Sequence, residues 1–112
     1  MKKVEAIIKL LELDTVRDAL TEAGVVAITV SEVRTFGRHT AHTEIYRGTS
    51  YAVKSCPQLK LELAVPDESV DEIVSLVCGV TRRKDDGDGK VFVSSLDDIV
   101  RVRTGEHGER AL

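Results

Sequence analysis

The stretch Leu59-Lys60-Leu61-Glu62-Leu63 decides the fold, because apolar and charged residues alternate along it. Successive side chains of a β-strand point to opposite faces of the sheet. The three leucines therefore face a core, and Lys60 and Glu62 face the other way. The alternation predicts a strand that is buried on one side only, which is typical of an antiparallel sheet covered on one face.

Apolar residues return at helical spacing on both sides of this strand. Upstream, a helix is predicted from 13 to 23, with apolar positions at Leu13, Val16, Ala19, Leu20 and Ala23. Gly24 follows it where a helix C′ residue belongs. Downstream, Pro66-Asp67 opens a second helix, Gly79 is predicted to end it, and its buried stripe is Val70, Ile73, Val74 and Val77.

Further strands are predicted where β-branched residues gather, at 3–9, 25–35, 90–93 and 100–103. Residues 37–55 are polar and show little periodicity, which is typical of a functional or disordered loop. We expect the polar tail 104–112 to be mobile. The order is β-α-β-loop-β-α-β with a small terminal strand. It indicates an α+β, ferredoxin-like double βαβ fold in one domain, residues 1–112.

Composition excludes several classes of protein. The chain has 112 residues, a formal net charge of −3, 4% aromatic residues and no Trp, which argues against a nucleic-acid partner. No apolar run approaches the length of a membrane span, and the first residues turn acidic before a signal peptide could form. Cys56 and Cys78 are isolated, so we interpret them as reduced thiols in a cytoplasmic protein.

Positive charge on the last predicted strand is the first candidate for a binding site. In Val100-Arg101-Val102-Arg103, the strand period would place both guanidinium groups on one face, about 7 Å apart. They would repel each other unless Glu62 or a bound anion neutralised them, and Arg offers a donor fork suited to phosphate. A solvated sheet edge is the alternative interpretation.

Glycine and a cation recur together at two other predicted strand ends. Gly87-Asp88-Gly89-Lys90 precedes a strand, and its glycines allow the backbone to approach an anion closely. Phe36-Gly37-Arg38 opens the long loop in the same way. Together with the two arginines these groups could line one phosphate pocket, although Gly-Asp-Gly is also an ordinary turn.

Other polar residues of the long loop fit weaker hypotheses. His39 and His42, with Glu44 or Cys56, could hold a metal ion, but solvated histidines are the simpler interpretation. Tyr46 and Tyr51 flank Arg47 in this loop, which suits contact with a partner or a modifying enzyme as well as packing of the loop itself. No nucleophile lies in a motif that would position it for covalent catalysis.

Taken together these motifs resemble the PII signal-transduction proteins, the nitrogen regulatory proteins P-II, over essentially the whole chain. The segments that carry the resemblance are Lys3-Val-Glu-Ala-Ile-Ile-Lys9, Thr29-Val-Ser-Glu-Val-Arg34, Phe36-Gly-Arg38, His42-Thr-Glu-Ile-Tyr-Arg-Gly48, Tyr51, Gly87-Asp-Gly-Lys-Val-Phe92 and Arg101-Val-Arg-Thr-Gly-Glu106. The resemblance implies a homotrimer that binds ADP or ATP, with Mg²⁺ in the case of ATP, in the clefts between subunits. It implies no enzymatic activity and no insertion into a membrane.

The resemblance also assigns segments and residues to tasks. Residues 37–55 match the T-loop, which docks onto a membrane transporter or a metabolic enzyme, and 82–90 match the B-loop. Tyr51 matches a tyrosine that some members have uridylylated, and Tyr46 and Arg47 lie on the same docking loop. The implied nucleotide-binding residues are Gly37, Arg38, Gly87, Asp88, Gly89, Lys90, Arg101 and Arg103, the last two reaching across from the neighbouring subunit.

Several positions depart from the family pattern, which predicts a divergent or PII-like member. Thr49-Ser50 replaces Ala-Glu before Tyr51, and Lys84 replaces a B-loop glycine. His39 stands where the family has the Gln that helps to hold Mg²⁺ and 2-oxoglutarate, and Gln58 where it has the Lys that pairs with the oxoacid. Loss of that ammonium removes a charge-assisted hydrogen bond worth about 1.5–3 kcal/mol, so we predict that sensing of 2-oxoglutarate is altered or lost.

Two alternative functions remain open at this point. In a slow ATP or ADP phosphatase, the cations would stabilise transferred charge, and Asp85, Asp86 or Asp88 would hold Mg²⁺. In the other, a trimer has lost its nucleotide and binds a metal or another small anion instead.

Overall fold

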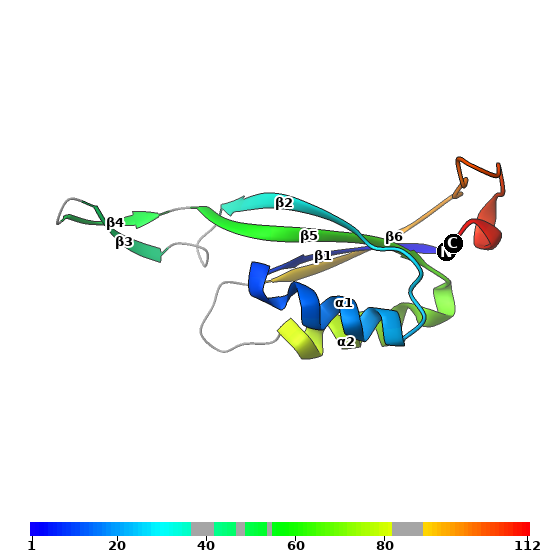
Figure 1. Ribbon diagram of the computed structural model, residues 1–112, viewed down its shortest axis with the longest axis horizontal. Helices are drawn as coiled ribbons and strands as arrows, with labels where there is room; N and C mark the ends of the chain where they lie inside the picture. Colours follow the sequence, from blue (N-terminus) through cyan, green and yellow to red (C-terminus); the bar gives the residue numbers. More distant parts are fainter. Residues whose placement is uncertain (37–41, 47–48, 54, 82–88) are drawn as a thin grey trace.

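The computed structural model describes residues 1–36, 42–46, 49–53, 55–81 and 89–112, with backbone alone at 42–46, 49–53 and 55–56. Its main sheet has four strands in the order β2-β5-β1-β6, and each neighbouring pair is antiparallel (Figure 1). The strands are β1 (Lys2–Ile8), β2 (Thr29–Phe36), β5 (Ser55–Val65) and β6 (Lys90–Ser95). The helices are α1 (Leu13–Glu22) and α2 (Val70–Thr81), each preceded by a short 3₁₀ turn, Leu10–Glu12 and Asp67–Ser69.

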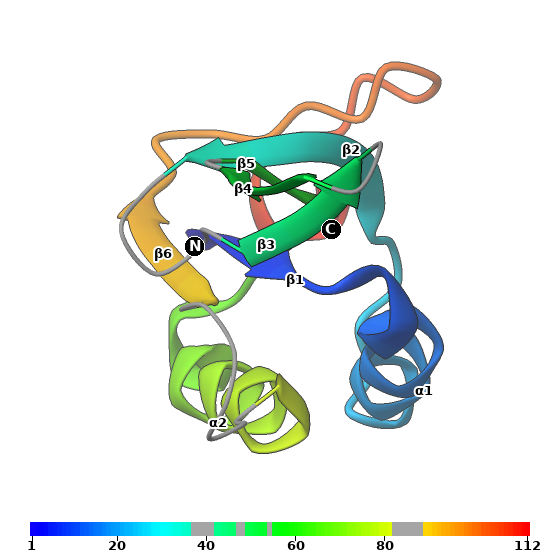
Figure 2. The same ribbon diagram turned by 90° about the vertical axis from the view of Figure 1, so that its left-hand side faces the viewer.

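Both helices cover the same face of the sheet (Figure 2), as the alternation in β5 predicts. Every second residue of the two central strands is buried beneath them: Val4, Ala6 and Ile8 in β1, and Leu59, Leu61, Leu63 and Val65 in β5. The helices contribute Val16, Leu20, Ile73 and Val77 to the same core. The predicted α+β ferredoxin-like fold is thereby confirmed.

The opposite face of the sheet carries a network of charged side chains. Lys3 Nζ lies 3.1 Å from Glu5 Oε1 and 3.1 Å from Glu62 Oε2, and Lys60 Nζ lies 3.4 Å from Glu62 Oε1. Hydrogen bonds from Lys3 and Lys60 hold the pKa of Glu62 below its ordinary value. Glu62 thus pairs with lysines of its own sheet, which does not support the alternative that it neutralises Arg101 and Arg103.

Two predicted boundaries shift. β2 begins at Thr29 rather than at 25, because the chain first closes α1: Val25 N–H donates to Leu20 O at 3.0 Å, and Gly24 has φ +91°, as a C′ glycine should. Gly79 does not end the second helix, which continues to Thr81. There the Thr81 hydroxyl donates to Val77 O at 2.8 Å and supports the last turn.

The segment predicted as an irregular loop contains regular structure. Strands β3 (His42–Tyr46) and β4 (Thr49–Val53) pair as an antiparallel hairpin, and β5 already begins at Ser55. This hairpin lies beyond the ends of β2 and β5 in Figure 1. Hydrogen bonds between the two strands stabilise this hairpin, although its polar sequence does not predict strands.

The C-terminal region also differs from expectation. Residues 100–103 form no strand: Val100 makes one isolated bridge with His107, and the residues between them turn. The tail, expected to be mobile, is folded and ends in a 3₁₀ helix, Gly108–Ala111. Arg101 and Arg103 therefore do not share the face of a strand.

Candidate functional site

Gly89 and Lys90 lie where the chain enters β6. Lys90 pairs with Ile7 of β1 and is exposed. A Cβ atom on Gly89 would lie only 2.9 Å from the carbonyl oxygen of Ile7, closer than side chains tolerate. Glycine fits here because the backbone passes close to β1, and pairing with Ile7 places Lys90 at the start of β6.

Gln58 lies on β5 near the same end of the sheet. It pairs with Val33 of β2 and follows Pro57, one residue before the Leu59–Ile8 pair. Its side chain is 4% exposed, and among the described residues its Oε1 has no hydrogen-bond partner. A hollow of about 360 Å³ adjoins it, lined by Leu10, Glu32, Val33, Arg34, Pro57 and Gln58. A neutral amide thus occupies a buried polar position.

Arg101 and Arg103 lie in the loop that follows β6. The Arg101 guanidinium donates from Nη2 to the main-chain oxygen of Leu112 at 2.7 Å. The Arg101 N–H donates to Glu106 O at 2.9 Å, and Gly105 N–H donates to Arg101 O at 2.7 Å. Arg103 is exposed at the tip of this turn. Hydrogen bonds within the C-terminal segment, not a sheet, therefore hold Arg101, and Arg103 lies in the turn that they close.

The structure separates the two groups of basic residues. β6 runs from Lys90, opposite Ile7, to Ser95, opposite Lys2, which is about 17 Å at the rise of a strand. The loop with the arginines lies beyond the Ser95 end, beside the two chain ends (Figure 1). One copy of the chain therefore does not bring Lys90 and Arg101 to the same phosphate.

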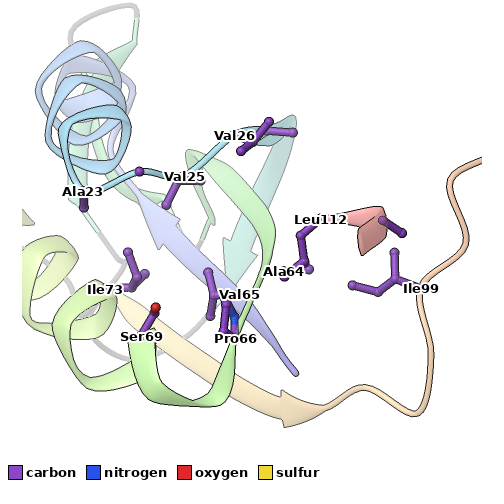
Figure 3. A pocket seen from close by; sticks show the side chains of 13 residues that line it. Ala23, Val25, Val26, Ala64, Val65, Pro66, Ser69, Ile73, Ile99 and Leu112 are labelled. Carbon is purple, nitrogen blue, oxygen red and sulfur yellow. The ribbon is translucent and has the colours of Figure 1, made fainter. Parts of the chain in front are cut away.

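An apolar cavity of about 270 Å³ lies under the C-terminal segment (Figure 3). Its walls come from the connection after α1, the end of β5, the start of α2 and the C-terminal residues. They include Val25, Val26, Ala64, Ile73, Ile99 and Leu112. Sequence reasoning missed this cavity, because the run Val25-Val26-Ala27-Ile28 fits the strand predicted over 25–35, whereas in the structure it precedes β2.

The remaining candidate residues lie either on the hairpin or outside the described residues. Gly37, Arg38, His39, Arg47, Gly87 and Asp88 lie outside the described residues. Tyr46 and Tyr51 lie on the two strands of the hairpin, paired with Thr49 and Glu44. Within the described ranges no three His, Cys, Asp or Glu side chains gather as a metal site, and Cys78 is a free thiol.

This arrangement defines the class of protein: a ferredoxin-like α+β domain with a hairpin beyond one end of its sheet and arginines at the other. The family model described as Nitrogen regulatory protein P-II matches residues 1–106. The chain therefore belongs to the P-II family of nitrogen regulatory proteins.

Relatives match along their full length. The chain is 51% identical to the nitrogen regulatory protein P-II of Rhodobacter capsulatus and 52% identical to that of Rhizobium etli. It is 46% identical to the nitrogen regulatory protein P-II 1 of Escherichia coli strain K12, and each match covers 100% of both chains. Identity at this level does not indicate the divergent membership that the sequence departures predicted. In the described residues no helix is long and apolar enough to cross a membrane.

Proposed function

We propose that this protein is a cytoplasmic P-II signalling regulator, not an enzyme, whose homotrimer binds ADP or ATP in the clefts between subunits. Residues 37–55 dock onto a membrane transporter or a metabolic enzyme, and the bound nucleotide favours one arrangement of this segment. The observation that carries the proposal is the separation of Lys90 from Arg101 and Arg103 along the sheet.

This separation argues for a site made by two copies. A nucleotide polyphosphate needs several cations around it, and lysine and arginine are the usual ones. Because one chain keeps Lys90 and the arginines at opposite ends of its sheet, we infer that a second copy supplies the missing group. The proposed nucleotide-binding residues are Gly37, Arg38, Gly87, Asp88, Gly89, Lys90, Arg101 and Arg103, with Mg²⁺ accompanying ATP.

The exposed surface is consistent with assembly of identical chains. On the face of the sheet away from the helices, Phe92 of β6 is 51% exposed. Val102, between the two arginines, is 97% exposed. Large apolar side chains at such positions favour contact with another protein surface. A neighbouring copy that covers Val102 would hold the arginines at its own phosphate site.

We propose that the second effector is not 2-oxoglutarate, or that this protein binds 2-oxoglutarate only weakly. Gln58 is neutral and buried, so it offers no ammonium to a carboxylate. The hollow beside it has both Glu32 and Arg34 in its lining. A different small anion is proposed as the second effector because Arg38 and Lys90 still offer positive charge. His39, the other changed position, lies outside the described residues.

Calorimetric titration of the purified protein with ADP, and then with Mg-ATP, tests this function. We expect saturable binding of nucleotide at one site per chain, with no tightening of Mg-ATP when 2-oxoglutarate is added. Binding that is absent for both nucleotides would refute the proposal. A clear gain in affinity with 2-oxoglutarate would refute only the part that concerns Gln58.

A further inference from the structure

One carboxylate, that of Asp98, closes the loop that carries Arg101 and Arg103. It does so at the neck of the loop, where residues 98–100 lie against residues 107–108. Asp98 Oδ1 accepts hydrogen bonds from the N–H groups of Ile99 at 2.9 Å and Gly108 at 3.2 Å. Its other oxygen, Oδ2, lies 2.8 Å from His107 Nδ1. Asp98 therefore binds both the outgoing and the returning chain.

The rest of the loop depends on this closure. Gly108 N–H also donates to Ile99 O at 3.0 Å, and Val100 bridges to His107. Gly108 has φ +68°, which directs the chain into the last 3₁₀ turn. Farther out, turn contacts such as Thr104 Oγ1 to Glu106 Oε1 at 2.9 Å shape the tip, and the Arg101 guanidinium also reaches Leu112 O at 2.7 Å. The neck is thus where the direction of the arginine loop is set.

Asp98 is charged at neutral pH. The hydrogen bond from His107, followed by those from the main chain, keeps the pKa of Asp98 below its ordinary value. An ionised carboxylate only accepts hydrogen bonds, so His107 Nδ1 carries the proton between them. Asp98 and His107 are both exposed, which places the contact at the surface and away from the core.

We infer that Asp98 is a positioning residue for nucleotide binding, which orients Arg101 and Arg103 by closing the loop between residues 98 and 108. This inference rests on the proposed function. The carboxylate touches no nucleotide itself; it acts through the two arginines. Without it, the ends of the loop keep the Gly108–Ile99 hydrogen bond and the Val100–His107 bridge but lose the three contacts of the carboxylate. The loop then varies more in direction, and nucleotide binding has to order it at the expense of affinity.

An electrostatic role and a positioning role of Asp98 predict opposite changes in ADP affinity when the residue is replaced with alanine. Removing an acid near a cationic site strengthens the attraction of an anion, so an electrostatic role alone predicts tighter ADP binding in D98A. A positioning role predicts weaker binding, by about tenfold, which is the scale of one lost well-ordered contact. Asp97→Ala is the matched control: it removes the same charge one residue earlier, from an exposed side chain.

The experiment measures ADP affinity by calorimetry for the native chain, D97A, D98A and D98N. Asparagine keeps an acceptor oxygen for the N–H groups of Ile99 and Gly108, so D98N should stay within about threefold of the native affinity. The oligomeric state should be unchanged in D98A, and the denaturation midpoint should fall slightly, because the hydrogen bonds that lower the pKa of Asp98 also stabilise the fold. In a chain that already carries Arg103→Ala, D98A should lower the ADP affinity by a smaller factor than in the native chain, because Asp98 and Arg103 act through the same loop.

The outcomes separate the two proposals. If the native chain binds no ADP, the proposed function fails, and this inference fails with it. If the native chain binds ADP and the double variant R101A/R103A does not, the nucleotide site stands. Native-like or tighter binding by D98A would then overturn the role of Asp98 alone, and so would an equal loss in D97A and D98A.

Discussion

Replacing Gly89, an exposed residue beside β1, with alanine should destabilise the fold by about 1–3 kcal/mol, the usual cost when an added carbon forces the backbone to shift. The new Cβ would lie 2.9 Å from Ile7 O, whereas ordinary contact begins near 3.4 Å. The carbonyl belongs to β1, which is held between β5 and β6 and has little room to retreat. Gly89 is not among the glycines with positive φ in the described chain. Any loss of stability is therefore steric and not conformational.

Gly79→Ala is the matched control for this substitution. Its new Cβ would have no neighbour within 4 Å, and Gly79 lies inside α2. Alanine there should stabilise the protein by about 0.5–1 kcal/mol, because it lowers the entropy lost on helix formation.

Denaturant unfolding at one fixed protein concentration gives both free energies, with circular dichroism as the probe. We expect the free energy of unfolding to fall in G89A and to rise in G79A. G89A should also weaken ADP binding, since Lys90 follows directly. If G89A unfolds at the native midpoint, or if both variants shift in the same direction, the steric explanation is refuted.

Three further predictions concern the core, the charged face and the arginines. Leu61→Ala, at a fully buried position, should lower the free energy of unfolding by about 2–5 kcal/mol in the same denaturant assay. Because the folded pKa of Glu62 is lowered, its pairing stabilises the protein above the ordinary glutamate pKa, and that contribution is lost as pH falls through the folded value. E62Q should therefore flatten the acid limb of stability against pH, and an unchanged limb would contradict the ion network. R101A/R103A should lose ADP binding while light scattering shows the native oligomer; unchanged affinity would exclude these arginines from the site.

The sequence alone determined the layers of this fold. Strict alternation in 59–63 and helical spacing in 13–23 are local patterns, and each has one arrangement that buries its apolar side chains. Gly24 after the first helix belongs to the same class of signal, since few other residues adopt its φ of +91°. The family motifs are likewise local stretches of sequence, which is why the resemblance to the P-II family is evident from the chain alone.

Tertiary structure decided where the site residues lie. Val100-Arg101-Val102-Arg103 has the composition of a strand, but a strand needs a neighbouring backbone, and Val100 finds only His107. The hairpin at 42–53 shows the converse, because its order comes from pairing with itself and not from its polar sequence. Whether Lys90 and Arg101 meet depends on strand register and chain direction, which no local pattern encodes. Local side-chain periodicity thus fixes which residues face the core, whereas long-range backbone pairing fixes which residues face each other.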